Sequence, residues 1–344
     1  MKAFRLFKPN TLRLMVFILV GLMLGLGLAQ SSLANTSGKK HHHHRVASSS
    51  PACEASPESA KRHSGHSGHH HARHHISRET VDSGRMIRAK AAFLLDMNTG
   101  RVLYSQDADK PIAPASITKV LTLYLTREAL AQGRLRPDTT IPVSSLAVHT
   151  GGSTMSLYKG EKVPVSELIK GISVVSANNA CVAVAEYMGK GNSRAFVARM
   201  NATARALGMT HSEFKNPNGL PASGQFTTAR DIAKLSASYL RRFPESLAIH
   251  SMTSYTYNGV THHNANSLLG RYEGVDGLKT GFVCASGYNI TATAKRGKTR
   301  LVAVVLGAAN PIIRETETAK LLDYGFTTVD QCPAPAKGNI RASN

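Results

Sequence analysis

The sequence predicts an α+β fold in which one antiparallel sheet is assembled from both ends of the folded region. Segments rich in apolar and β-branched residues, typical of strands, occur at residues 91–106 and again at residues 277–308. Between these segments, apolar residues recur at the three- and four-residue spacing of helices. Strands at both ends with helices between them favour an antiparallel sheet that carries a helical insertion.

Composition limits the classes of protein to which the chain can belong. It has 344 residues, 42% of them hydrophobic, so it can bury a substantial core. Four cysteines are too few for a disulfide framework, and a single long apolar run excludes a polytopic membrane protein. The formal net charge of +21 favours an anionic partner. No nucleic-acid-binding motif is recognisable, so we expect no nucleic-acid partner.

Residues 1–34 have the pattern of a signal peptide. Basic residues precede an apolar stretch, Leu14–Ala29, and the small residues Ser32 and Ala34 follow it. No twin-arginine pair is present, so we predict export by the general secretory route to the bacterial periplasm or cell envelope. The stretch is slightly short for a spanning helix, although an uncleaved N-terminus would tether the protein to the membrane.

Residues 35–85 have the composition of a disordered, His-rich linker. Eleven of the 16 histidines lie between His41 and His75, and large apolar residues are scarce. Such a tract cannot build a core. Imidazole groups suit zinc, copper and nickel, but a flexible tract offers no fixed coordination geometry. We therefore predict a solvated tether and no metal site.

From residue 86 onward each element has its own local signal. Residues 91–97 and 101–106 flank a turn that contains Gly100, which predicts a hairpin. Pro114 lies shortly before an apolar run of helical length at residues 116–133, which Gly133 ends. Apolar spacing predicts two helical segments within residues 166–190, broken near Ser176, and further helices at residues 193–208 and 227–242.

The second group of strands lies near the C-terminus. Residues 277–283, 288–298 and 299–308 read as adjacent strands, with Gly297 in one turn. A helix is expected to follow at residues 311–326. We therefore expect one domain over residues 86–326 and a flexible tail at residues 327–344.

Ser116-Ile117-Thr118-Lys119 lies at the start of the first long helix. Positions i and i+3 share one face of a helix, so the Lys119 amine can reach the Ser116 hydroxyl. The first helical turn also has free backbone N–H groups and a positive dipole end, which stabilise developing negative charge. The pattern S-x-x-K alone is weak evidence, because it occurs four times in this chain.

Two further motifs strengthen this interpretation. Ser176-Ala177-Asn178 is the only S-x-N segment in the sequence and falls in a predicted helix break. Lys279-Thr280-Gly281 is the only K-T-G segment and lies in a predicted strand. The order S-x-x-K, S-x-N, K-T-G is that of penicillin-binding proteins and class A β-lactamases.

Longer stretches carry a closer resemblance. PASITKVLT, GEKVPVSELIKGISVVSANNACVAVAE, FKNPNGLP and VDGLKTG resemble the serine D-alanyl-D-alanine carboxypeptidases, the low-molecular-mass penicillin-binding proteins of peptidase family S11. The resemblance covers about residues 88–326. It implies a three-layer, DD-peptidase/β-lactamase-like fold. It also implies an exported enzyme without cofactors that removes the terminal D-Ala from peptidoglycan pentapeptide stems and is acylated by β-lactams.

The resemblance implies a catalytic group of three residues. Ser116 would be the nucleophile that attacks the carbonyl between the two D-alanines. Lys119 would be the general base, which requires a pKa lowered by burial and by the nearby charge of Lys279. Ser176 would relay protons.

Further residues would bind the substrate. Asn178 would hold its amide, Lys279 and Thr280 would bind it at the strand edge, and Gly281 would let its backbone approach. The backbone N–H groups of Ser116 and Phe282 would form the oxyanion hole. Arg314 lies where the family has an arginine implicated in gripping the terminal carboxylate, for which a guanidinium is suited.

Several alternatives stay open. A DD-endopeptidase would use the same residues, and a β-lactamase would use the same scaffold, although no E-x-x-L-N segment lies between Asn178 and Lys279. A non-catalytic cell-wall or metal-binding protein would not need all three motifs. For the cysteines, we expect Cys181 and Cys284 to be two buried thiols, with a bridge between them as the alternative.

Overall fold

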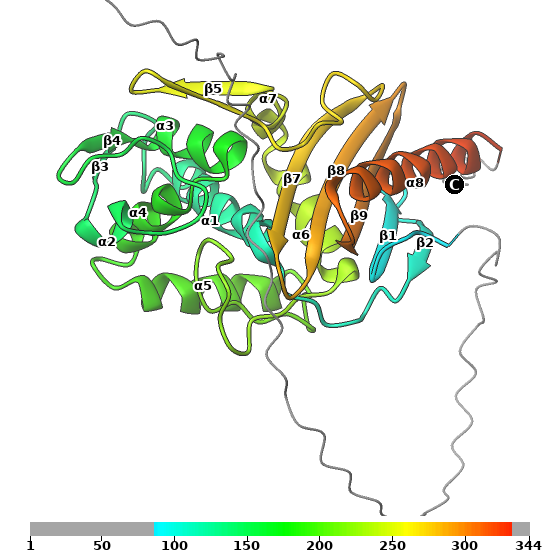
Figure 1. The fold of residues 1–344 in the computed structure, drawn as a ribbon, viewed down its shortest axis with the longest axis horizontal. Helices are drawn as coiled ribbons and strands as arrows, with labels where there is room; N and C mark the ends of the chain where they lie inside the picture. The colour runs from blue at the N-terminus through cyan, green and yellow to red at the C-terminus, as the bar shows by residue number, and fades with distance from the viewer. Residues whose placement is uncertain (1–85, 332–344) are drawn as a thin grey trace, which may run out of the picture. The chain divides into compact units, whose positions relative to one another are not determined.

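The computed structural model describes residues 86–331, which belong to one compact unit of the chain (Figure 1). The predicted signal peptide at residues 1–34, the His-rich linker at residues 35–85 and residues 332–344 lie outside the described residues. Within residues 86–331, no helix is both long and apolar enough to cross a membrane. The same region contains no cluster of three His, Cys, Asp or Glu side chains that could hold a metal ion.

A five-stranded antiparallel sheet joins the two ends of this region. Its strands are β1 (Ala91–Asp96), β2 (Val102–Gln106), β7 (Val275–Val283), β8 (Gly287–Arg296) and β9 (Thr299–Ala308). The strand order is β2-β1-β9-β8-β7, and every neighbouring pair is antiparallel. The predicted sheet from both chain ends is therefore confirmed. Because β7 is an edge strand, one of its sides has no strand partner.

The sheet is buried on both faces, as the alternation along its strands shows. In β1, Phe93 packs into one apolar core and Leu94 into the other, and neighbouring residues of β9 alternate in the same way. Helix α8 (Pro311–Gln331) covers one face through Leu321, Leu322 and Phe326. Helix α6 (Ala229–Arg242) covers the other face. The result is the three-layer α+β arrangement that was expected.

The remaining elements form the helical part of the domain between β2 and β7. The helices are η1 (Ala115–Thr118), α1 (Lys119–Ala131), α2 (Ser145–Val148), α3 (Val165–Lys170), the π-helical segment η2 (Gly171–Val175), α4 (Asn178–Met188), α5 (Ser193–Ala206), η3 (Pro244–Ser246) and α7 (Leu247–His250). Two small hairpins accompany them, β3 (Thr140–Pro142) with β4 (Lys162–Pro164) and β5 (Ser254–Tyr257) with β6 (Val260–His263). Apolar side chains surround α1, which runs through the core of this part.

Most predicted elements are present, but several short ones were not predicted and one helix ends later than expected. The short hairpins β3–β4 and β5–β6 were not predicted, because their strands are too short for a clear alternation. Helix α8 ends at Gln331 and not at Phe326, so its last turn takes up residues that were assigned to the tail. The longer helix is explained by Val329, which also packs against the core on this face of the sheet.

The cysteine expectation is wrong for one of the two residues. Cys181 is a buried free thiol, as expected. Cys284 is disulfide-bonded, so it is not a thiol. Because Cys181 is free, the alternative bridge between Cys181 and Cys284 is excluded as well.

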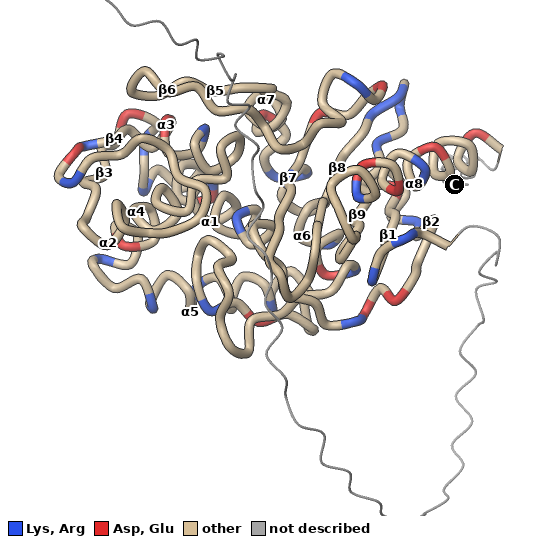
Figure 2. Tube along the Cα trace, viewed as in Figure 1, with Lys and Arg blue, Asp and Glu red and all other residues tan. Residues whose placement is uncertain are grey.

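Charged residues are distributed over the whole described region. Figure 2 shows Lys and Arg on the helices and at the strand ends, with acidic residues interspersed along α8. Several of these charges pair with each other, as in the bidentate contact between Arg300 and Asp276. The excess of basic residues therefore does not by itself mark a binding surface.

Candidate active site

Ser116 and Lys119 meet at the junction between η1 and α1. The 3-10 turn of η1 runs directly into α1, which places the two side chains on one face. The Lys119 Nζ lies 2.8 Å from Ser116 Oγ. It also donates a hydrogen bond of 2.5 Å to the backbone carbonyl of Asn218. The Lys119 amine is therefore held by both the Ser116 hydroxyl and the Asn218 carbonyl.

Burial changes the acidity of Lys119. Its side chain is fully buried, and this desolvation lowers its pKa to about 8, while the nearby thiol of Cys181 acts weakly in the opposite direction. The expected interaction between the two lysines is found in the pKa of Lys279, which the charge of Lys119 lowers. A neutral amine is thus accessible near neutral pH, as a general base for Ser116 requires.

Lys279 belongs to the same buried group of cations. Its pKa lies well below the ordinary value because it is buried, and the charges of Lys119 and Arg314 lower the pKa further. The Lys279 Nζ donates to the carbonyl of Thr280 at 2.9 Å. Among the described residues, neither lysine forms an ion pair with a carboxylate of the chain. Burial makes both lysines lose their protons more readily than exposed lysines, and an anionic ligand beside them would favour their charged forms.

Ser176 lies at the break between η2 and α4, as predicted. Its backbone is left-handed, with φ 64° and ψ 31°, a conformation that non-glycine residues adopt at a cost of about 1–2 kcal/mol. Such strain is common at functional sites. The side chain is nearly buried.

Asn178 begins α4 two residues later and is tied to a neighbouring loop. Its Nδ2 donates to the carbonyl of Gly151 and its backbone N–H to the carbonyl of Ser153, both at 2.7 Å. A side chain at Gly152 would lie 2.6 Å from Asn178 Nδ2 and 3.7 Å from a methyl of Leu220. The loop, Asn178 and the segment that carries Asn218 are therefore packed together.

The K-T-G segment lies on the edge strand β7 and touches the turn that carries Ser116. A Cβ atom on Gly281 would lie 2.8 Å from the backbone nitrogen of Ser116 and 3.1 Å from the Ala115 side chain. Gly219 approaches Ala115 from elsewhere in the chain, and a Cβ atom on it would overlap the Ala115 carbonyl. Gly281 therefore lies close to the backbone of the nucleophile, and the expected approach of the substrate backbone to Gly281 stays a prediction.

Phe282 follows on β7 and is partly exposed. Its side chain is 39% exposed and packs against Tyr288 of β8, with ring centroids 4.4 Å apart. The free side of β7 offers backbone N–H and C=O groups to an extended peptide.

Arg314 lies in the first turn of α8 and is buried. Its Nη2 donates to the carbonyl of Ala265 at 3.1 Å and to the carboxylate of Glu315 at 2.8 Å. Its Nε is buried and has no partner among the described residues. The guanidinium charge reaches Lys279, which places it in the group of buried cations.

One residue of the site was missed from the sequence. Asn218, whose carbonyl accepts from Lys119, lies in the turn 216–220, where Asn216 Oδ1 accepts from the backbone N–H of Gly219 at 2.7 Å. Thr122 of α1 donates to the Pro217 carbonyl at 2.6 Å. The segment Asn-Pro-Asn-Gly does predict a turn, but only the fold shows which side chain the turn contacts.

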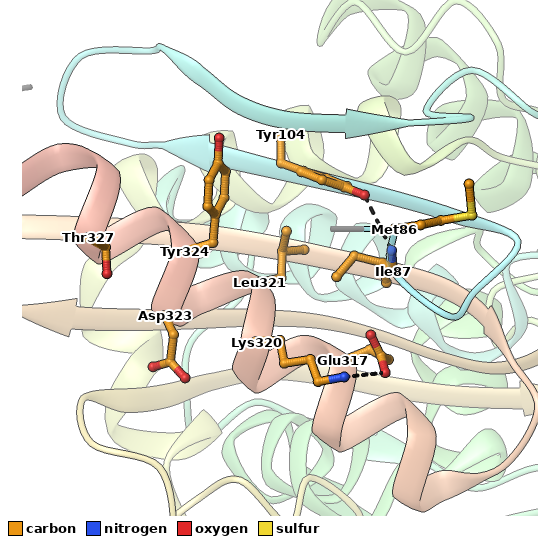
Figure 3. A pocket seen from close by; sticks show the side chains of 9 residues that line it. All are labelled: Met86, Ile87, Tyr104, Glu317, Lys320, Leu321, Asp323, Tyr324 and Thr327. Carbon is orange, nitrogen blue, oxygen red and sulfur yellow. Dashed lines mark hydrogen bonds and ion pairs between the residues drawn. The ribbon is translucent and has the colours of Figure 1, made fainter. Parts of the chain in front are cut away.

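A well-formed cavity of about 420 Å³ lies elsewhere, between α8 and Tyr104 of β2 (Figure 3). Glu317 on its wall accepts hydrogen bonds from Arg88 and Lys320. None of its lining residues belongs to the three motifs. The candidate site is therefore defined by the contacts around Ser116 and not by this cavity.

Comparisons with known proteins agree with the geometry. A family model described as D-alanyl-D-alanine carboxypeptidase, Peptidase_S11, matches residues 77–310. D-alanyl-D-alanine carboxypeptidase DacC of Escherichia coli is 39% identical over 247 residues, which cover 70% of this chain and 62% of the relative. DacF of Bacillus subtilis is 37% identical over 256 residues, which cover 71% of this chain and 64% of the relative. The chain thus spans less than two thirds of the length of these relatives.

Solved structures show the same fold. Penicillin-binding protein 5 from Haemophilus influenzae is 36% identical with a TM-score of 0.68, over 70% of this chain and 72% of that one. Penicillin-binding protein D2 from Listeria monocytogenes, in its cefotaxime-bound form, is 32% identical with a TM-score of 0.64. The match covers 70% of this chain and 98% of that one. The chain combines the S-x-x-K, S-x-N and K-T-G motifs with this fold. It belongs to peptidase family S11, the D-alanyl-D-alanine carboxypeptidases.

Proposed function

We propose that the protein is a serine DD-carboxypeptidase that removes the terminal D-Ala from peptidoglycan pentapeptide stems and is acylated by β-lactams. The observation that carries this proposal is the 2.8 Å contact between Ser116 Oγ and the buried Lys119 Nζ, whose pKa is lowered to about 8. A serine hydroxyl needs a neighbouring base to act as a nucleophile, and this lysine is the base within reach.

Acylation begins with the neutral Lys119 amine. It takes the proton of Ser116 while Oγ attacks the carbonyl between the two D-alanines. The backbone N–H groups of Ser116 and Phe282 stabilise the oxyanion, each such donor contributing about 2.7–4 kcal/mol. The C–N bond then breaks, and the leaving D-Ala amine takes a proton from Lys119, relayed through the Ser176 hydroxyl.

Deacylation reverses the roles of the same groups. Water attacks the ester on Ser116 and gives up a proton to the Lys119–Ser176 pair. The ester C–O bond breaks, Ser116 recovers its proton, and the shortened stem leaves as a free carboxylate. No cofactor takes part.

The substrate is held along the free edge of β7. Its extended backbone adds a strand there, and Asn178 binds its amide. Lys279, Thr280 and Arg314 receive the terminal carboxylate, which would neutralise part of the buried positive charge. For Arg314, this requires the guanidinium to share its donors between Glu315 and the substrate.

The same proposal extends to location and domain organisation. The protein acts outside the cytoplasm, in the periplasm or cell envelope. Residues 1–34 direct its export, residues 35–85 tether the catalytic domain, and an uncleaved N-terminus would anchor it in the membrane. The catalytic domain begins near residue 86 and, given α8, ends near residue 331.

Labelling with a fluorescent penicillin tests this proposal. The full chain is expected to form a covalent adduct that peptide mass mapping locates on Ser116, and Ser116→Ala is expected to form none while keeping its thermal unfolding midpoint. A label on another residue, or one that survives Ser116→Ala, would show that Ser116 is not the nucleophile.

A further inference from the structure

A chain of hydrogen bonds leads from the surface to the strand that carries the K-T-G motif. Arg127 Nη1 donates to exposed Glu245 at 3.0 Å, and Arg127 Nε donates to the Tyr239 hydroxyl at 3.0 Å. That hydroxyl lies 3.1 Å from His250 Nε2, and His250 Nδ1 lies 3.1 Å from the carbonyl oxygen of Leu278. Tyr239 and His250 are fully buried, and Arg127 is nearly so.

The position of each proton in this chain follows from chemistry. A carbonyl oxygen only accepts, so His250 Nδ1 must carry the hydrogen that faces Leu278. Burial and the charges of Arg127 and Lys279 lower the His250 pKa to about 3, so the ring is neutral and its Nε2 can only accept. The Tyr239 hydroxyl therefore donates to Nε2 and accepts from Arg127. One tautomer of His250 satisfies every partner.

This series of hydrogen bonds ends at the Leu278 carbonyl, in the peptide bond just before Lys279. The preceding carbonyl, that of Gly277, accepts from Asn266 Nδ2 at 3.1 Å. Two successive carbonyls of β7 are thus held by side chains from outside the sheet. Helix α7, which ends at His250, packs against β7 at the same place. The direction of this peptide determines where Lys279 points and how β7 lies against Ser116.

We propose that His250 is a positioning residue for the reaction at Ser116. Through its Nδ1–H it fixes the Leu278 carbonyl, and thereby the orientation of Lys279 and the spacing between β7 and the nucleophile. Tyr239 and Arg127 fix the His250 tautomer. The inference rests on the proposed function, because it concerns the rate at which Ser116 is acylated.

The test compares two substitutions of His250 in the full chain. His250→Leu fills the space but has no donor. His250→Asn keeps an N–H group near the place of Nδ1. The rate constant for acylation by a fluorescent penicillin is measured and normalised to the folded fraction. We expect His250→Leu to slow acylation by about tenfold or more, since small displacements of catalytic groups have effects of this size or larger. His250→Asn should recover most of the lost rate.

Asp96→Ala is a matched control for lost stability. Asp96 is also buried and accepts two hydrogen bonds, from the backbone of Asn98 and the hydroxyl of Thr99. It lies at the end of β1, which β9 and β8 separate from β7. Asp96→Ala should lower the unfolding midpoint without slowing acylation of the folded protein.

Tyr239→Phe completes the set, because it retains His250 but removes the hydroxyl that fixes its tautomer. It should slow acylation, and it tests the inference even where His250→Leu fails to fold. Equal rates for His250→Leu and His250→Asn, or for Tyr239→Phe and the unmodified protein, would overturn the positioning role. If the unmodified protein itself is not acylated at Ser116, the proposed function fails instead.

Discussion

Gly281 and Ser116 are in direct backbone contact, since a Cβ atom on Gly281 would lie 2.8 Å from the Ser116 nitrogen. This nitrogen belongs to the proposed oxyanion hole, together with that of Phe282, the residue after Gly281. The contact therefore sets the spacing of the two donors. A residue larger than glycine must push β7 away from the turn that carries the nucleophile.

Gly281→Ala is expected to slow acylation by about a hundredfold, the typical cost of displacing catalytic groups by about 1 Å. The measurement is the rate of covalent labelling by a fluorescent penicillin. Gly151→Ala is the matched control, because Gly151 is also near the site but a Cβ atom on it would meet no heavy atom within 4 Å. Equal rates for the two variants would show that the contact has no catalytic importance.

The acylation rate should depend on pH through Lys119. Its pKa of about 8 means that the neutral form, the one able to accept a proton, increases as the pH rises and predominates above pH 8. The rate should therefore rise with pH and level off above about 8. Lys119→Arg, which stays protonated, should be inactive throughout. A rate that is flat between pH 6 and 9 would contradict the role of Lys119 as base.

The same lysine should reduce the stability of the fold at neutral pH. Its folded-state pKa of about 8 lies below the ordinary value of 10.5, so burial disfavours the protonated form. Below pH 8 this cost is fully present, about 3 kcal/mol, and it is relieved as the pH rises from 8 towards 10.5. Lys119→Met should therefore raise the free energy of unfolding at pH 7 while abolishing activity.

Urea unfolding at several pH values measures this effect. The advantage of Lys119→Met over the unmodified protein should shrink between pH 8 and 10.5. Lys110→Met, at an exposed lysine, should change stability little at any pH. An advantage that grows with pH would contradict the sign of the Lys119 shift.

Substitutions of Ser176 separate its hydroxyl from its backbone. Ser176→Gly and Ser176→Ala both remove the hydroxyl, but only glycine adopts the left-handed conformation without strain. If the hydroxyl relays protons, both variants should lose activity, by about 10²–10⁴-fold. Ser176→Gly should be the more stable of the two by about 1 kcal/mol. Full activity in Ser176→Gly would refute the proton relay.

Much of the fold was predictable because its signals are local. The turn at Gly100, the strands around Lys279 and the helix break at Ser176 are each marked by neighbouring residues. The nearly continuous apolar run of β9 is likewise typical of a strand that is buried on both faces. The short hairpins carry too few residues for such a pattern.

The site was predictable in its motifs but not in its supporting contacts. The pairing of Ser116 with Lys119 follows from helical spacing. The carbonyl of Asn218, by contrast, reaches Lys119 across 99 residues of sequence, and His250 reaches Leu278 across 28. Nothing near either residue indicates its partner, because these contacts depend on how distant elements pack.

Mass spectrometry of purified muropeptides incubated with the full chain shows whether the protein removes the terminal D-Ala from pentapeptide stems. Pentapeptide monomers and crosslinked dimers would both be supplied, with Ser116→Ala as the control. The pentapeptide should lose one alanine with the unmodified protein and none with Ser116→Ala. Cleavage of dimers would add endopeptidase activity. A pentapeptide left intact by the folded protein would contradict the proposed carboxypeptidase function.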